Sequence, residues 1–331
     1  MRTLLAAILA LTVTSSFAAE APIVIKFSHV VAVDTPKGKA ADYFKKIAEE
    51  RTKGRVKVEV YPNSQLYKDK EEMEALQLGA VQMLAPSLAK FGPLGVKEFE
   101  IFDLPYIFDS YAEVDKVMKG PIGAKLFTKL ETKGIKALGF WENGFKNFSS
   151  NKPIRTPDNL RGMKIRIQSS KVLDEEMRTL GALPQVMAFS EVYQALQTGV
   201  VDGTELEPSN LYTSKAFEVQ KHLTLTNHGF LGYAVIVNKT FWEGLPADIR
   251  ATLTTAMNDS SVYANQIAKQ ETDKALAAIK ASGKTTIYTP TAAERAAFRK
   301  ALIPVHQKMS SRFGQDLLTE IYKETAFKPV E

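Results

Sequence analysis

Cysteine is absent from the 331 residues of the chain. Its absence excludes disulfide bonds, thiolate catalysis and the cysteine-containing kinds of zinc site. The four histidines, His29, His222, His228 and His306, show neither HxH nor HExxH spacing, which argues against a histidine-based metal site. We therefore expect no bound metal and a fold stabilised by core burial alone, which a chain of this length can supply.

Motifs for common catalytic sites are also missing. The chain has no GxSxG, no GxxxxGK[ST] and no GxGxxG that opens a helix after a strand. Their absence weakens hydrolase, P-loop and dinucleotide-binding readings, and we expect no cofactor. Neighbouring carboxylates occur at Glu49–Glu50, Glu71–Glu72 and Glu175–Glu176, with Lys and Arg nearby. We interpret these pairs as solvated helix faces rather than acid/base dyads.

Long apolar runs are confined to the N-terminus. The segment MRTLLAAILALTVTSSFAAEA combines one basic residue, Arg2, an apolar stretch, and small residues at Ser16 and Ala18. This pattern is typical of an export signal, and we predict that residues 1–18 are removed by cleavage near Ala18. A short buried helix is the alternative. No run reaches the roughly 18–20 apolar residues of a membrane span, so we predict a periplasmic protein that does not insert into the membrane.

Neither sign of charge is strongly in excess. The formal net charge is +6 and 24% of the residues are charged. The basic residues form no polybasic run and no aromatic–basic alternation, so we expect no nucleic-acid partner. A mild cationic bias fits a small anionic ligand.

Strand and helix patterns alternate along the rest of the chain. The predicted strands are Ile23–Ser28, Val56–Pro62, Val81–Ser87, Met163–Ser169, Pro184–Phe189, Val200–Glu205 and Tyr233–Asn238. The predicted helices between them are Lys37–Arg51, Asp69–Gly79, Lys171–Leu180 and Ser190–Gly199. This rhythm predicts an α/β fold of two units, each a mostly parallel sheet flanked by helices.

The longest helical pattern runs from Pro246 to about Ser282 without glycine or proline. At about 1.5 Å per residue it would be roughly 50 Å long, which exceeds the width of a small domain. We predict one helix that touches both domains. The alternative is two helices with a break near Asn258–Ser260.

Several cations and polar residues follow predicted strands. Lys37 follows the first strand, Ser87 and Lys90 follow the third, and Lys146 with Asn147 ends the segment FWENGFKN. The carboxyl ends of strands in an open α/β sheet meet at one crevice, where helix N-termini add partial positive charge. We expect an anion site there, although each lysine alone also fits an ordinary solvated position.

Arg166 and Gln168 lie on the polar face of the alternating segment MKIRIQ. If helices cover both faces of the sheet, the guanidinium of Arg166 is buried, and an uncompensated buried charge costs several kcal/mol. Its partner is either internal, with Glu205 and Glu207 as candidates, or the carboxylate of a ligand held by two parallel N–H···O bonds.

Eight collinear segments cover nearly the whole chain after the export signal and carry a family likeness. They are KFSHVVAVDTPKGKAA, VYPNSQLY, LAPSLAKFGPL, FDLPYIF, KIRIQSS, PQVMAFSEVYQALQTGVVDGTE, SNLYTSKAFEVQKH and LGYAVIVNK. Together they resemble the periplasmic solute-binding subunits of TRAP transporters, of the DctP type that captures C4-dicarboxylates. The block MAFSEVYQALQTGVVDG alone is close to diagnostic of that family.

The resemblance implies a two-lobed binding protein that closes over one organic acid. Lobe I would comprise residues 19–142 and about 231–271, and lobe II residues 143–230 and about 272–331, joined by crossing strands and the long helix. The implied function is capture of succinate, malate or fumarate, without catalysis. The implied partners are the small carboxylate and the integral membrane subunits of a TRAP permease, with the binding subunit itself a monomer.

The resemblance also implies a set of ligand-binding residues. The family's signature arginine falls on Arg166 through the KIR match, and Tyr233 falls at the rim of the cleft through the LGYAV match. The full predicted set is Arg166, Lys90, Lys37, Ser87, Lys146, Tyr233, His29, Gln168, Leu206 and Asn210. Relatives that bind sialic acid or monocarboxylates carry arginine at the matches to Lys90 and Lys146, so two lysines favour a second small carboxylate.

One departure from the family pattern leaves the exact acid open. Many relatives carry Asn-Pro where this chain has Leu206-Glu207, which removes an amide and adds a carboxylate. Alternatives therefore stand beside the main reading: another carboxylate as ligand, or a subunit that reports its ligand to a sensor kinase. A periplasmic enzyme, with His29 as general base and Lys90 as electrostatic stabiliser, is the third.

Overall fold

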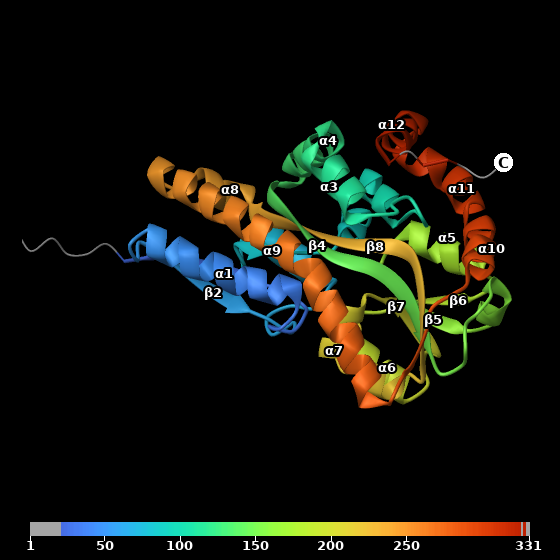
Figure 1. The fold of residues 1–331 in the computed structure, drawn as a ribbon. Helices are drawn as coiled ribbons and strands as arrows, with labels where there is room; N and C mark the ends of the chain where they lie inside the picture. The colour runs from blue at the N-terminus through green and yellow to red at the C-terminus, as the bar shows by residue number, and fades with distance from the viewer. Residues whose placement is uncertain (1–20, 326, 329–331) are drawn as a thin grey trace, which may run out of the picture.

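The structure, a computed structural model, describes residues 21–325 and 327–328 (Figure 1). The predicted signal peptide and its cleavage site lie outside the described residues. The strands are β1 (Ile23–Ser28), β2 (Val56–Tyr61), β3 (Met83–Leu84), β4 (Ile135–Ser150), β5 (Lys164–Ile167), β6 (Leu183–Val186), β7 (Gly203–Leu206), β8 (His222–Asn238) and β9 (Thr286–Tyr288).

Helices cover the sheet and complete the chain. The α-helices are α1 (Pro36–Arg51), α2 (Glu71–Gln77), α3 (Tyr111–Lys119), α4 (Pro121–Leu130), α5 (Lys171–Thr179), α6 (Val192–Gln197), α7 (Pro208–Thr213), α8 (Lys239–Glu243), α9 (Ala247–Ser282), α10 (Ala292–Leu302), α11 (Pro304–Phe313) and α12 (Gln315–Thr325). The 3-10 helices near the interlobe cleft are η1 (Leu88–Phe91), η2 (Lys97–Asp103) and η5 (Phe189–Glu191). No helix in the described ranges is long and apolar enough to cross a membrane.

In the described chain the strands form one mixed sheet in the order β2-β1-β3-β8-β4-β7-β5-β6, with β9 beside β8. Parallel strands β2, β1 and β3 form one end, and parallel strands β7, β5 and β6 form the other. Between them, β4 and β8 pair antiparallel and run through both lobes (Figure 1). The predicted α/β architecture of two parallel units joined by crossing strands is confirmed.

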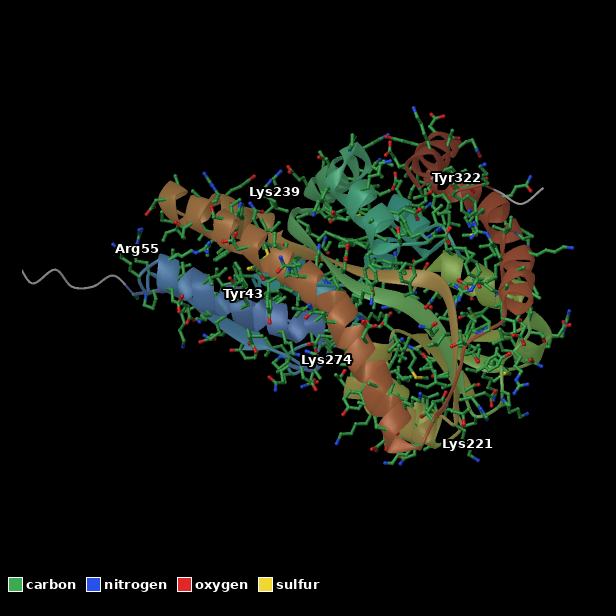
Figure 2. The ribbon with its side chains drawn as sticks, in the orientation of Figure 1. Tyr43, Arg55, Lys221, Lys239, Lys274 and Tyr322 are labelled. Atoms are coloured by element: carbon green, nitrogen blue, oxygen red, sulfur yellow. The ribbon has the colours of Figure 1, made fainter. Side chains whose placement is uncertain are left out.

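A single 36-residue helix, α9, crosses from one lobe to the other (Figure 1). It packs on α1, where the rings of Tyr43 and Tyr263 lie 4.8 Å apart, and Figure 2 shows Tyr43 on α1. It also contacts β4, where Trp141 Nε1 donates to Ser261 Oγ at 3.1 Å. The predicted long helix is therefore confirmed, and the alternative of a break near residues 258–260 is wrong.

The described chain has three apolar cores, of which the two largest flank the central strands. One is built by α1, β1, β8 and α9 around Phe27, Phe44 and Trp141. The larger one joins η2, α3 and α4 to α5 and the C-terminal helices α10–α12. Segment 97–130, which the predicted boundaries assign to lobe I, thus packs against C-terminal helices assigned to lobe II. The boundaries themselves stay a prediction.

Some predicted elements differ in the structure. The third strand keeps only Met83–Leu84, because the chain turns into η1 after Pro86. Lys146 was placed at a strand end but lies inside β4, beside a register shift between Lys146 and Phe148. An irregular register re-aims the side chains next to it, and the burial of Lys146 accompanies this shift.

Gly38, in the first turn of α1, lies against the loop that follows β1. A Cβ at this position would lie 2.5 Å from the main-chain oxygens of Ala32 and Val33. We expect Gly38→Ala to lower the free energy of unfolding by about 1–3 kcal/mol, because backbone must move to make room. Urea unfolding measures this loss. Gly244→Ala is the matched control with a smaller expected loss, because the atom nearest to a Cβ there lies at 3.3 Å. A Gly38→Ala variant with the same free energy of unfolding as the wild type would contradict the prediction.

Candidate functional site

A small cavity lies where the two lobes meet. Its free volume is about 20 Å³, which is room for about one water molecule. Its walls follow the carboxyl ends of β1, β3, β5 and β7, the place where open α/β sheets bind ligands. The lining residues are Val30, Val31, Lys37, Asp69, Ser87, Lys90, Arg166, Gln168, Phe189, Glu205, Leu206, Glu207, Asn210, Leu231 and Tyr233.

The structure brings most of the predicted site residues together. Eight of the ten line this cavity: Lys37, Ser87, Lys90, Arg166, Gln168, Leu206, Asn210 and Tyr233. Lys37, Ser87, Lys90, Arg166 and Gln168 come from the two parallel strand groups, as the strand-end argument predicts, whereas Tyr233 lies inside β8 and was predicted from the family resemblance. The other two, His29 and Lys146, do not line it. Ligand contact by each of the ten stays a prediction.

Arg166, in β5, is 1% exposed. Its Nε and Nη2 donate to the main-chain oxygen of Met187 at 3.1 and 2.8 Å, and within the described chain it forms no ion pair. Burial lowers the pKa of Arg166, and the carboxylate of Asp69, followed by those of Glu205 and Glu207, opposes this without an ion pair. The alternative of an internal ion pair with either glutamate is therefore wrong. Nη1 donates no hydrogen bond within the described residues, so it can bind an anion.

Lys90, in η1, is already paired. Its Nζ contacts Asp69 Oδ1 and Glu72 Oε1. Burial alone would raise the pKa of Asp69, but the charge and hydrogen bond of Lys90, followed by the charge of Arg166 and the hydrogen bond from Phe189 N, outweigh it and lower that pKa to about 2. The charge of Lys90 is thus already neutralised. A ligand carboxylate that binds Lys90 would have to share its ammonium with Asp69 or displace Asp69 from it.

Lys37, in the first turn of α1, has a different environment. Its Nζ donates to Ala85 O at 2.9 Å and lies 3.8 Å from the ring centroid of Tyr233. In the described chain it has no ion-pair partner within 4 Å. Burial, assisted by the positive charge of Lys90, lowers the pKa of Lys37 to about 7. Lys37 is therefore a buried amine that changes its charge near neutral pH.

Lys146 is buried and paired with acidic side chains. Its Nζ lies 3.1 Å from Glu205 Oε2 and 3.8 Å from Asp103 Oδ1, and it stands outside the cavity lining. Behind it, His228 Nε2 lies 3.6 Å from Glu176 Oε1. Lys146 is therefore the cation of a buried polar cluster next to the cavity. Its ion pair with Glu205 connects it to the cavity lining.

His29 is buried behind the cavity lining. Neither ring nitrogen has a hydrogen-bond partner in the described chain. Burial, with the nearby charge of Lys37, lowers the pKa of His29 to about 3. His29 does not line the cavity, and an imidazole with so low a pKa is a weak base, so the general-base role in the enzyme alternative finds no support in this geometry.

The interpretation of the carboxylate pairs as solvated is wrong for two members. Glu72 is buried against Lys90, and Glu176 is buried beside His228. Burial, followed by the charge of Glu205, raises the pKa of Glu176 well above its ordinary value.

Over the described residues, no group of three or more acidic or histidine side chains is arranged to hold a metal ion.

Several polar contacts connect the lobes around the cavity, among them Asn210 Nδ2 to Tyr233 Oη at 3.2 Å. Gln168 Nε2 donates to Ser87 Oγ at 2.9 Å, and Phe189 N donates to Asp69 Oδ2 at 2.7 Å. Farther out, Lys68 pairs with Glu191 at 2.8 Å. A groove of about 650 Å³ adjoins the cavity and shares Asp69, Lys90, Arg166 and Gln168 with it. A four-carbon acid is larger than the cavity of about 20 Å³. The lobes or the side chains must therefore move before such an acid can enter.

Three acidic residues of the lining escaped sequence reasoning as site residues. The sequence indicates Asp69 only as the first residue of a predicted helix, and Glu205 only as a possible partner for Arg166. Glu207 did carry a signal, because it stands where many relatives have proline. In the structure its Oε2 accepts hydrogen bonds from Asn210 Nδ2 at 2.8 Å and Asn143 Nδ2 at 3.1 Å. Burial raises the pKa of Glu207 to about 7.

Comparisons with known proteins agree with this geometry. The sequence model of "Bacterial extracellular solute-binding protein, family 7" matches residues 27–312. The C4-dicarboxylate-binding periplasmic protein DctP of Rhodobacter capsulatus is 64% identical over 305 residues, which are 92% of each chain. A TRAP periplasmic solute-binding protein from Sulfurospirillum deleyianum, solved with bound succinate, is 46% identical with a TM-score of 0.89, covering 91% of this chain and 99% of that one. One from Pseudomonas aeruginosa with bound L-malate is 41% identical with a TM-score of 0.85, covering 87% and 100%.

Proposed function

The chain belongs to the bacterial extracellular solute-binding proteins of family 7, and from this membership we propose that it is the periplasmic binding subunit of a TRAP transporter that captures a C4-dicarboxylate. Relatives that cover nearly the whole chain are C4-dicarboxylate-binding proteins, and solved relatives contain succinate or L-malate. Succinate, malate and fumarate are the ligands that this proposal names.

One observation carries the proposal. The buried guanidinium of Arg166 lines the interlobe cavity, is held by Met187 O, and has no carboxylate partner within the described residues. A buried cation of this kind needs an anion with good geometry. A ligand carboxylate supplies it, and the planar guanidinium can bind both carboxylate oxygens.

Binding would couple to lobe closure. One carboxylate of the acid binds Arg166 in lobe II, and the other binds Lys37 and Ser87 in lobe I, with Lys90 close by. Such a dianion bridges the lobes, and expulsion of water strengthens its charge-assisted contacts. The acid stabilises the closed form only through its higher affinity for that form.

The remaining parts of the proposal follow from the family. The closed subunit delivers its acid to the membrane subunits of a TRAP permease driven by an ion gradient. It acts as a monomer in the periplasm, binds no cofactor, and performs no chemistry on the acid. Nuclear magnetic resonance spectra of the acids after incubation with the protein are expected to show no product.

A thermal-shift screen followed by calorimetry tests the proposal. The protein without residues 1–18 is expected to be stabilised by succinate, malate and fumarate, by about 2.7 kcal/mol at a ligand concentration 100 times Kd. Galacturonate and a monocarboxylate such as lactate serve as controls with smaller shifts. Stabilisation by either control, with none by any of the three C4 acids, would contradict the proposal.

A further inference from the structure

The cavity carries hydrogen-bond acceptors that the capture of two carboxylates leaves unused. Oδ1 of Asn210 and Oε1 of Gln168 are buried and have no donor in the described chain, and both residues line the cavity. Buried polar atoms without a partner are uncommon and costly. An ionised carboxylate cannot satisfy them, because it has no hydrogen to donate.

The orientation of the Asn210 amide is fixed by its neighbours. Nδ2 donates to Glu207 Oε2 at 2.8 Å and to Tyr233 Oη at 3.2 Å. If the amide turned over, Oδ1 would face Glu207 Oε2, which already accepts from Asn143. Two acceptor oxygens would then meet without a hydrogen between them, both when Glu207 is ionised and when it carries its proton on Oε1, the oxygen that accepts no bond from Asn210 or Asn143. Glu207 therefore keeps Oδ1 as the unsatisfied atom of Asn210.

Gln168 lacks such a constraint. Its Nε2 donates to Ser87 Oγ at 2.9 Å, and a hydroxyl can donate as well as accept. The Gln168 amide can turn over and keep a hydrogen bond to Ser87, so it adapts to a donor or an acceptor. Asn210 is thus the acceptor of fixed polarity in this cavity.

We propose that Asn210 is a specificity-determining residue that accepts a hydrogen bond from a hydroxyl group of the ligand. The protein then prefers a hydroxy-substituted C4-dicarboxylate, such as malate, to succinate, which has no donor. Glu207 is the positioning residue that holds the Asn210 amide. This inference rests on the proposed function. An amino-substituted dicarboxylate also brings donors, but its ammonium would enter a cavity lined by Lys37 and Arg166.

Calorimetry on the wild-type protein at neutral pH tests the preference. We expect one enantiomer of malate to bind about tenfold or more tightly than succinate, because succinate leaves the buried oxygen unpaired. L-aspartate is expected to bind more weakly than that malate. Succinate binding as tightly as both malates, or aspartate binding more tightly, overturns the inference. If neither malate nor succinate binds, the proposed function itself fails, which is a distinct result.

Two variants separate specificity from structure. Asn210→Leu removes the acceptor at similar volume, and Glu207→Gln lets the Asn210 amide turn over. In both, the ratio of malate affinity to succinate affinity is expected to fall toward one. An equal loss for both acids, with the ratio unchanged, overturns the inference. Asn258→Leu, on the exposed side of α9, is the control with an unchanged ratio. Thermal melting checks that each variant folds. If neither site variant folds, the ratio of malate affinity to succinate affinity in the wild-type protein decides the inference.

Discussion

Replacing Arg166 by lysine is expected to weaken binding of a C4-dicarboxylate by about two to three orders of magnitude, since removing one partner of a buried charge pair costs about 3–5 kcal/mol. The guanidinium uses Nε and Nη2 on Met187 O and still presents Nη1. A lysine ammonium has a single nitrogen and cannot hold a main-chain oxygen and a carboxylate in the same plane. Calorimetric titration of wild type and variant with succinate and malate measures the loss.

A matched substitution controls for the loss of any arginine. Arg178 lies on α5 and is paired with Asp174 on the same helix, in an exposed position. Arg178→Lys is therefore expected to leave the affinity unchanged, since exposed pairs of this kind contribute little. If Arg166→Lys binds the acids as tightly as wild type while melting at the same temperature, the role proposed for Arg166 is wrong.

Much of the fold could be predicted from the sequence, because the patterns that determine it are local. The 36 residues of α9 lack glycine and proline, and their apolar spacing alone predicts one long helix. The length of β8, His222–Asn238, was underestimated. Its first eleven residues contain Asn227 with positive φ and the two glycines Gly229 and Gly232, which are local signals against a strand. Pairing with β4 overrides them, and such pairing is a tertiary effect that the sequence of one strand does not encode.

The candidate site was predicted in part for a related reason. The end of a strand can be located from the sequence, so Arg166, Ser87 and Lys37 could be predicted as site residues, and they line the cavity. The partners that set the charge of each cation come from distant segments. Asp69 and Glu72 neutralise Lys90, and Glu205 neutralises Lys146. Only folding brings these carboxylates within contact, so the sequence could identify the cations but not which of them stay unpaired.

These pairings leave an uneven charge balance in the cavity. Lys90 is matched by Asp69, and Glu205 is matched by Lys146. The unmatched lining groups are then Arg166 and Lys37 as cations and Glu207 as an anion. A dianion that binds the two cations also approaches Glu207. Protonation of Glu207 removes this repulsion, and protonation of Lys37 supplies the second positive charge, so both changes favour the complex.

Raising the pH from about 6.5 to about 8.5 is therefore expected to weaken binding of a C4-dicarboxylate by about tenfold or more, since each proton required in the complex costs up to tenfold per pH unit. Burial and Lys90 lower the pKa of Lys37 to about 7, so this amine loses its charge as the pH rises. Burial raises the pKa of Glu207 to about 7, so this carboxyl gains its charge over the same range. Calorimetry at several pH values measures the affinity.

The same experiment counts the protons and assigns them. In two buffers of different ionisation enthalpy, binding near pH 8 is expected to take up one to two protons. Glu207→Gln removes one titrating group and is expected to flatten the pH dependence, whereas Lys57→Met, at an exposed position of β2, is expected to leave it unchanged. The ligand does not cause the slope, because ordinary carboxyl groups, with a pKa of about 4, are ionised throughout this range. A constant affinity without proton uptake would mean that neither buried group changes its charge on binding, and that the dianion is balanced by Arg166 and an already protonated Lys37.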